Sequence, residues 1–209
     1  MQDESVISRP LIAWGVARRA LPGQVVCGDL HLIQPIRDGV LAAVVDGLGH
    51  GNEALAAAQT AIAVLERHAE APLTALVNLC HDALTKTRGA VMTLATLRSF
   101  EDQLTWLGVG NVEAMLLRAD RQAKAPGDRV LLRGGLVGYQ VPVLRASTLR
   151  LAPGDLLIFA TDGIEARFAE GLVRSDSPQQ LADDILERHF KGHDDALVLV
   201  VRYLGTQHE

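Results

Sequence analysis

Short apolar segments that run directly into aspartates most constrain how this chain can fold. The segment Gly39 to Val45 is followed by Asp46-Gly47, and the segment LLIFAT is followed by Asp162-Gly163. A third apolar segment, Ala196 to Val201, is preceded by Asp194-Asp195. Short apolar runs bounded by turn residues predict strands that are buried on both faces. A carboxylate at the end of a buried strand is costly unless it is paired, so these aspartates need a common explanation.

The order of predicted elements favours a layered α+β domain over alternating βαβ units. We expect one domain over residues 1–209, in which Gly110-Asn111 forms a tight hairpin turn. Ser177, Pro178 and Gln180 form the start signal of a late helix. The predicted strands are 11–17, 24–34, 39–45, 90–98, 104–109, 112–118, 129–133, LLIFAT and 196–203, and the predicted helices are 52–69, 72–87 and 178–190.

Composition excludes several classes of function. The net charge is −5 and aromatic residues make up 4% of the chain, so neither a basic face nor stacking aromatics for nucleic acid are expected. The longest apolar runs are too short to span a bilayer, and the polar N-terminus has no signal core, so we expect a cytoplasmic protein without membrane contact. The two cysteines, Cys27 and Cys80, form no zinc pattern and no phosphate loop of a cysteine phosphatase.

The aspartates favour an oxygen-rich metal site. Asp29 lies within a further apolar stretch, in the sequence CGD. Several carboxylates that converge repel one another unless a cation neutralises them. Mg²⁺ and Mn²⁺ prefer such oxygen ligands. The alternative is that both Asp-Gly pairs are ordinary turns, which the spacing alone leaves open.

The motifs taken together resemble a known family. CGD, VVDGLGHG before a helix, GVGNVEA, LAPGDLLIFATDGIEA and HDDALVLVV follow one another in the chain. This series resembles the bacterial branch of the PPM (PP2C-like) serine/threonine phosphatases, which includes the SpoIIE/RsbU type. Within this branch the chain is most similar to the lone-domain phosphatases of the stressosome. The resemblance implies a PP2C-like α/β/β/α sandwich, with two central antiparallel sheets flanked by helices.

The resemblance also implies a site for two ions, Mn²⁺ or Mg²⁺, between the sheets. In that site Asp46 bridges both ions, the carbonyl of Gly47 binds one, and Asp162 and Asp194 bind the other. Asp29 matches an acidic position near the second ion and would act through water. Asp195 matches the position beside the last ligand, so it is included among the metal-binding residues but ranks below Asp194. The catalytic set is therefore Asp46, Asp162 and Asp194, and a metal-bound hydroxide attacks phosphorus directly.

The chain departs from the family pattern at three positions, one of which is Leu197 in place of the usual threonine of the last motif. Arg18 and Arg19 are the arginines that lie upstream of the first acidic residue. The stretch GQVVCGD lacks the phosphate-binding arginine that better-known members carry before the first acidic residue. Ala166 stands where some members have an aspartate for a third ion. His50, in the loop GLGHG, lies near the expected site and either orders the loop or assists as an accessory residue.

The expected activity is hydrolysis of phosphoserine or phosphothreonine on STAS-domain proteins of a stressosome-like complex, which would reset a stress-signalling pathway. One alternative substrate is an anti-anti-sigma factor outside any stressosome. Two further alternatives are a non-catalytic PPM-fold binding module and a hydrolase of small phosphoesters. Intact Asp46, Asp162 and Asp194 favour the enzyme over the binding module.

Overall fold

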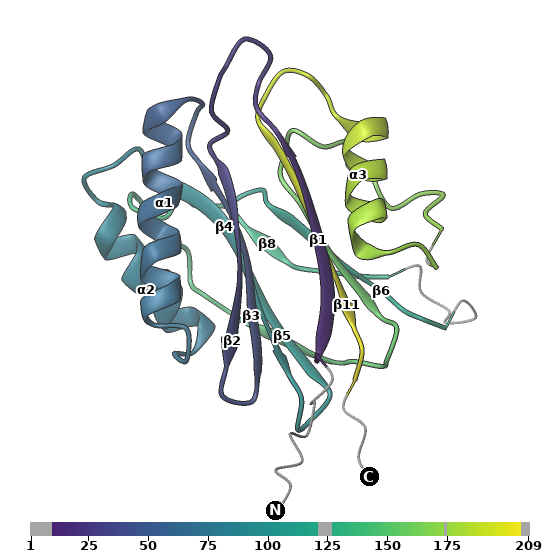
Figure 1. Cartoon of the computed structure of the whole chain (residues 1–209). Helices are drawn as coiled ribbons and strands as arrows, with labels where there is room; N and C mark the ends of the chain where they lie inside the picture. The colour runs from purple at the N-terminus through teal and green to yellow at the C-terminus, as the bar shows by residue number, and fades with distance from the viewer. Residues whose placement is uncertain (1–9, 121–126, 174, 206–209) are drawn as a thin grey trace, which may run out of the picture.

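Two β-sheets packed face to face form the centre of the protein (Figure 1). The computed structural model describes residues 10–120, 127–173 and 175–205. The first sheet, called here the β1 sheet, has the order β1 (Ile12–Arg19), β11 (Ala196–Tyr203), β10 (Leu156–Ala160), β6 (Glu113–Leu117) and β7 (Asp128–Arg129). The second, the β3 sheet, has the order β2 (Asp29–Ile36), β3 (Gly39–Gly47), β4 (Ala90–Arg98), β5 (Gln103–Val109) and β8 (Leu132–Arg133), and β9 (Ser147–Arg150) also pairs with β5.

Helices cover the outer face of each sheet. Helices α1 (Asn52–Arg67) and α2 (Leu73–Leu84) pack on the β3 sheet, and α3 (Pro178–His189) packs on β1 and β11 (Figure 1). The buried apolar side chains accordingly form three clusters, one under α1 and α2, one between the sheets and one under α3. This arrangement is the predicted α/β/β/α sandwich, with antiparallel pairing everywhere except between β5 and β8.

Local sequence explains where α3 begins and why it lies close to β1. The Ser177 hydroxyl accepts a hydrogen bond from the Gln180 N–H, and the Gln180 side chain accepts one from the Ser177 N–H, which completes the predicted capping box. Gln179 then bonds the backbone of Val16 on β1 in both directions. A Cβ on Gly15 would lie 2.3 Å from the Gln179 nitrogen, so only glycine allows this close approach.

Four details of the prediction were wrong. Gly110-Asn111 is not a hairpin turn, because β5 and β6 belong to different sheets and this segment crosses between them. The strand predicted over 24–34 begins only at Asp29, after an irregular loop. The strand predicted over 129–133 is split between β7 and β8, which lie in different sheets, and β9 was missed. Apart from the late start of β2, each error concerns a choice of strand partner, which local sequence does not encode.

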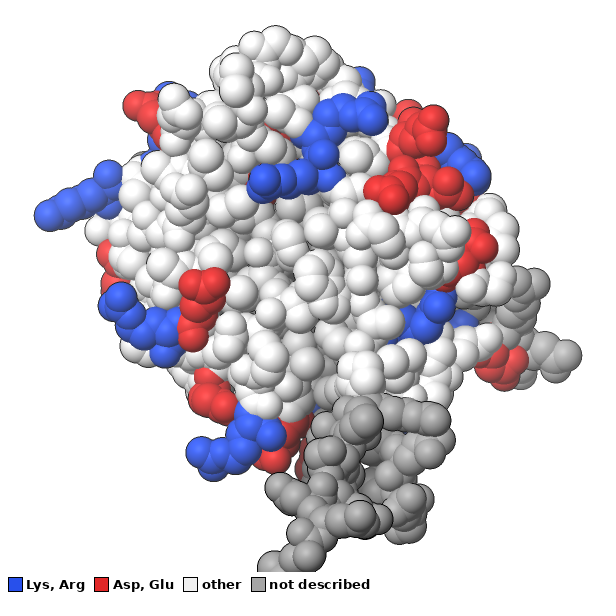
Figure 2. Space-filling model, viewed as in Figure 1, with Lys and Arg blue, Asp and Glu red and all other residues white. Residues whose placement is uncertain are grey.

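The charged side chains give no sign of a nucleic-acid surface on the face drawn in Figure 2. Acidic and basic side chains alternate around its rim, and uncharged atoms cover its centre. In residues 10–120, 127–173 and 175–205, no helix combines the length and apolar character needed to cross a membrane.

Candidate functional site

A cavity of about 420 Å³ lies where strands of both sheets end. Asp46 enters it from β3, whereas Asp162 follows β10 and Asp194 precedes β11. The fold therefore brings together the three predicted catalytic aspartates. Asp46 is 116 residues before Asp162 in the sequence, and Asp194 lies further still. The cavity is lined by Asp46, Leu48, Gly49, Val91, Gly110, Asn111, Gly134, Gly135, Asp162 and Asp194.

Asp29 lies beside Asp46 at the base of this region. The two are direct partners in the antiparallel pairing of β2 and β3, so their side chains leave the sheet on the same face. Asp29 is 2% exposed, and its Oδ2 accepts a 2.8 Å hydrogen bond from the Thr161 hydroxyl at the end of β10. Thr161 Oγ1 in turn accepts a 2.8 Å bond from the Leu197 N–H of β11. Asp29 is thus fixed by the opposite sheet.

The glycine after each aspartate permits close packing of the backbone. A Cβ on Gly47 would lie 2.0 Å from the Ala54 carbonyl oxygen of α1. A Cβ on Gly163 would lie 2.0 Å from the Asp195 carbonyl oxygen. Neither glycine has a positive φ. The alternative that both Asp-Gly pairs are ordinary turns is therefore wrong for Asp46-Gly47, which lies at the end of β3. Asp162-Gly163 does form a turn, in which the Ile164 N–H donates a 3.0 Å hydrogen bond to the Thr161 carbonyl, and Gly163 also allows the Asp195 backbone to pass close by.

Asn111 and Lys191 hold Asp162. The Asn111 side-chain amide donates a 2.8 Å hydrogen bond to Asp162 Oδ2, and Lys191 Nζ donates a 2.7 Å bond to the Asp162 backbone oxygen. Asn111 reaches this position because its segment crosses between the sheets. The sequence analysis assigned no role in the site to Asn111 or Thr161, although they lie within the motifs GVGNVEA and LAPGDLLIFATDGIEA. A polar side chain beside a motif glycine or aspartate was the available signal.

Asp194 and Asp195 have different surroundings. Asp194 lines the cavity, and its Oδ1 accepts a 2.8 Å bond from the Asp195 N–H. Asp195 is 2% exposed, and its two carboxylate oxygens accept 2.7 Å bonds from the backbone N–H groups of Leu21 and Gly28. The Asp195 carboxylate therefore anchors the loop between β1 and β2 from outside the cavity lining.

Burial and mutual repulsion raise the pKa values of these carboxyl groups. Burial, followed by the charges of Asp29 and Asp162, raises the pKa of Asp46 to about 9. Burial is also the main cause that raises the pKa of Asp29 to about 7, although the Thr161 hydrogen bond opposes it. The pKa of Asp162 is raised by burial and by the Asp194 charge. A cation placed among these groups would reverse the repulsion.

The donor set fits a hard divalent cation that keeps part of its water shell. The cavity offers carboxylate oxygens from both sheets and no thiol or imidazole. Within the part of the chain that the structure describes, no three His, Cys, Asp or Glu side chains form a ready-made ligand cluster. Mg²⁺ typically binds through one or two carboxylates and several waters, so a closed cage is not required.

The predicted accessory residue His50 and the segment beginning at Gly134 have clear locations. His50 is exposed and lies outside the cavity lining, so its accessory role stays a prediction. Gly134 and Gly135 line the cavity, and the following segment is held by paired hydrogen bonds between Val137 and Ala90. Burial, followed by the Asp29 charge, raises the pKa of Cys27 to about 12, which disfavours a thiolate nucleophile.

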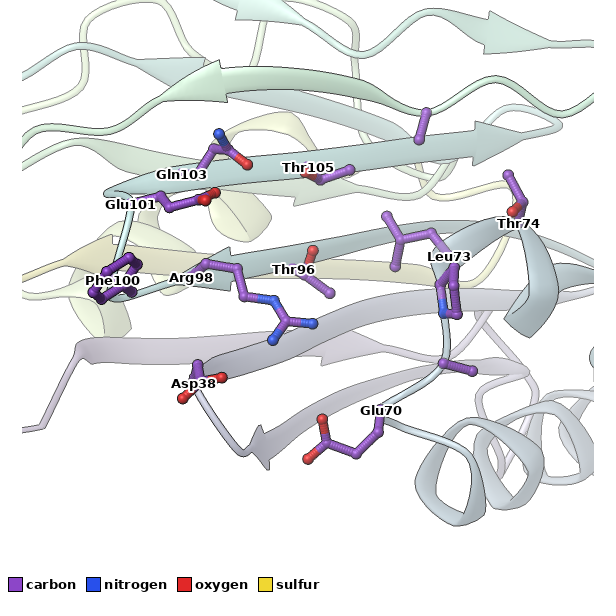
Figure 3. A pocket seen from close by; sticks show the side chains of 13 residues that line it. Asp38, Glu70, Leu73, Thr74, Thr96, Arg98, Phe100, Glu101, Gln103 and Thr105 are labelled. Carbon is purple, nitrogen blue, oxygen red and sulfur yellow. The ribbon is translucent and has the colours of Figure 1, made fainter.

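A second cavity, of about 670 Å³, lies at the opposite end of the β3 sheet (Figure 3). Arg98 at the end of β4 extends into it near Asp38 and Glu70, and Phe100 lies at its edge. Asp46 lies near the end of β3 and pairs with Val91 near the start of β4, whereas Arg98 is at the end of β4 and pairs with Gly39 at the start of β3. This cavity is therefore separate from the aspartate site.

Comparison with known proteins identifies the class. The family model described as Stage II sporulation protein E (SpoIIE) matches residues 37–204. The fold and this match define a PP2C-type serine/threonine phosphatase domain. The chain belongs to the SpoIIE family.

Among curated proteins, phosphoserine phosphatase RsbX of Bacillus subtilis (strain 168) is 21% identical over 183 residues, which cover 88% of this chain and 90% of RsbX. A chain solved in work on the bacterial stressosome, described as a modular system adapted to control secondary messenger signalling, is 30% identical with a TM-score of 0.82. That match covers 91% of this chain and 99% of the other. The structure of RsbX in complex with magnesium is 21% identical with a TM-score of 0.80, and the match covers 92% and 95% of the two chains.

Proposed function

We propose that this protein hydrolyses phosphoserine or phosphothreonine with the help of two divalent cations, Mg²⁺ or Mn²⁺, held at the aspartate cavity. The observation that carries the proposal is the convergence of Asp46, Asp162 and Asp194 on one cavity from both sheets. The proposed ligands are Asp46, the Gly47 carbonyl, Asp162 and Asp194. Asp29, buried beside Asp46, would contribute its negative charge to the site. The magnesium bound to the similar protein RsbX supports the choice of metal.

The cations would supply positive charge for the phosphoryl oxygens and would make a water molecule nucleophilic near neutral pH. The protein's own residues prepare the site for them. Thr161 directs its hydroxyl proton to Asp29 and so keeps that carboxylate oriented in the buried base of the site. Asn111 does the same for Asp162 at the cavity wall. These hydrogen bonds favour the charged forms of the carboxylates, which are the forms that bind a cation.

Asp195 has a different role in this proposal from the one that the family resemblance implies. Both of its carboxylate oxygens are occupied by backbone N–H donors. It therefore supports the site by fixing the loop that leads into Asp29. Removal of its charge would weaken one buried and one part-buried hydrogen bond, which is a cost in folding free energy.

The activity is tested by hydrolysis of p-nitrophenyl phosphate and of a phosphoserine peptide. Protein stripped with EDTA should be inactive, and Mg²⁺ or Mn²⁺ should restore turnover. Full activity without metal would exclude the two-ion mechanism. No metal-dependent turnover of either substrate would favour a non-catalytic binding module.

For the biological substrate we propose phosphorylated STAS-domain proteins of a stressosome-like complex in the cytoplasm. The similarity to RsbX and to the chain solved in stressosome work supports this choice. The test is to phosphorylate candidate STAS proteins with their cognate kinase and to follow loss of phosphate with Mn²⁺ present. If those proteins keep their phosphate while an anti-anti-sigma factor loses it at the same enzyme dose, the alternative substrate is correct.

A further inference from the structure

The aspartate cavity lacks a cationic side chain of its own. Among its lining residues, all of which lie in the described part of the chain, there is no Lys, Arg or His. A phosphorylated side chain carries a charge of about −1.5 to −2 at pH 7. Such a substrate must approach carboxylates, so a nearby cation would reduce the repulsion and orient the phosphoryl group.

The Arg88 guanidinium lies close to the wall of the cavity. A Cβ on Gly49, a lining residue, would lie only 2.8 Å from Arg88 Nη1. The segment around Arg88 is tied to the same wall, because the Leu48 N–H donates a 3.1 Å hydrogen bond to the Gly89 carbonyl. The guanidinium group is thus placed at the rim by fixed backbone on both sides.

Arg88 is also available to a ligand. Its side chain is 49% exposed and forms an ion pair with Glu53 in the first turn of α1, whose side chain is 69% exposed. Exposed ion pairs contribute only about 0–1 kcal/mol. A phosphate group can therefore replace Glu53, and arginine binds two phosphate oxygens at once in a geometry that Lys cannot reproduce.

Two other cations lie near the cavity and are less suited to this task. Lys191 directs its ammonium group to the Asp162 backbone oxygen at 2.7 Å. Arg133 precedes the lining residue Gly134, but it is part of β8, and no contact of its guanidinium with the cavity wall is seen among the described residues. Of these three cations, Arg88 is the one whose guanidinium lies beside a lining residue, Gly49.

We propose that Arg88 is the phosphate-binding residue of this site, and that Glu53 holds its guanidinium at the rim until substrate arrives. This inference rests on the proposed phosphatase function. It assigns substrate specificity to the turn between α2 and β4, because Gly49 has no side chain between Arg88 and the cavity.

The experiment measures three quantities in the Mg²⁺-loaded protein: kcat and KM for a phosphoserine peptide, and the inhibition constant of inorganic phosphate. Arg88→Ala should raise KM and the phosphate inhibition constant about tenfold, which corresponds to the loss of one charge-assisted hydrogen bond. Its Tm and its Mg²⁺ affinity should stay at the wild-type values, and Arg88→Lys should recover only part of the loss. Glu53→Gln should leave phosphate binding unchanged or make it tighter.

Arg98→Ala is the matched control. Arg98 is the last residue of β4, whereas Arg88 lies just before that strand, so about 25–30 Å of strand separates them. Wild-type constants for Arg88→Ala, or a loss that appears only in Arg133→Ala, would overturn the proposal. An equal loss in Glu53→Gln would also overturn it, because the ion pair would then act as a structural unit.

Failure of the proposed function gives a different result from failure of this inference. Titration calorimetry of the Mg²⁺-loaded protein with inorganic phosphate reports on Arg88 even if no substrate is turned over. Binding that is weakened by Arg88→Ala without any catalysis would contradict the phosphatase and keep the phosphate site. Catalysis with unchanged phosphate binding in Arg88→Ala would support the phosphatase function and contradict the assignment of Arg88.

Discussion

The Thr161 hydroxyl donates a 2.8 Å hydrogen bond to Asp29 Oδ2 and thereby joins the two sheets at the base of the aspartate cavity. Asp29 belongs to β2, and Thr161 directly follows β10 in the other sheet. Both side chains are 2% exposed. Since the bond is buried, it fixes the separation of the sheets where the metal-binding residues meet.

Replacement of Thr161 should therefore damage the site and the fold together. Thr161→Val leaves Asp29 without its donor, so we expect a loss of about 1–3 kcal/mol in unfolding free energy. Mg²⁺ affinity should also fall, whereas Thr161→Ser should behave like the wild type. Urea unfolding and Mg²⁺ titration measure the two effects. Thr148→Val is the control, because the Thr105–Thr148 hydroxyl pair is exposed and lies outside the cavity lining.

Asp46→Asn should abolish turnover without unfolding the metal-free protein. Burial and neighbouring carboxylates raise the pKa of Asp46 to about 9, so it is already uncharged near neutral pH, and asparagine should leave the apo protein about as stable as the wild type there and more stable at higher pH. Mg²⁺ should stabilise the wild type by about 2.7 kcal/mol at a hundredfold excess over its Kd, and the variant should lose most of this gain. Thermal melts with and without Mg²⁺ test both statements. A variant with wild-type turnover would remove Asp46 from the mechanism.

The apo protein should lose stability as pH rises. The pKa of Asp46 is about 9 in the fold, compared with about 3.9 for an unperturbed aspartate. A carboxyl whose pKa is raised by folding stabilises the fold below the unfolded value, and this contribution disappears as pH rises through the folded value. Asp29, with a pKa of about 7, acts in the same direction. In EDTA, Tm should fall between about pH 5 and pH 9, and Asp46→Asn should flatten the trend.

Asp194 and Asp195 should separate into a metal ligand and a structural anchor. Asp195→Asn weakens one buried and one part-buried bond to backbone N–H groups, so we expect a loss of about 1–3 kcal/mol in stability, even without metal. Asp194→Asn should leave apo stability nearly unchanged and should reduce Mg²⁺ affinity at least tenfold. The pair of variants is compared by urea unfolding and Mg²⁺ titration. A reversal of the two patterns would falsify the assignment of roles.

The individual elements near the site could be predicted because their signals are local. The run Ala196 to Tyr203 was predicted with both ends correct, and the capping box at Ser177 set the start of α3. The strand beginning at Asp29 was misplaced, since Val25 and its neighbours are apolar yet belong to an exposed loop. Hydrophobicity alone cannot tell a strand from a loop that another segment anchors.

The sequence by itself determined the acidic residues, their positions at strand ends and the family to which their order belongs. Tertiary structure decided which of them face the cavity. Asp194 and Asp195 are neighbours of the same type, yet only Asp194 lines the cavity, because Asp195 is turned toward the backbone of the β1–β2 loop. Likewise Asn111 and Arg88 reach the site only through the crossing between the sheets and the contact with Gly49. Partners so distant in the chain are chosen by packing, which acts on the whole fold and leaves no local pattern.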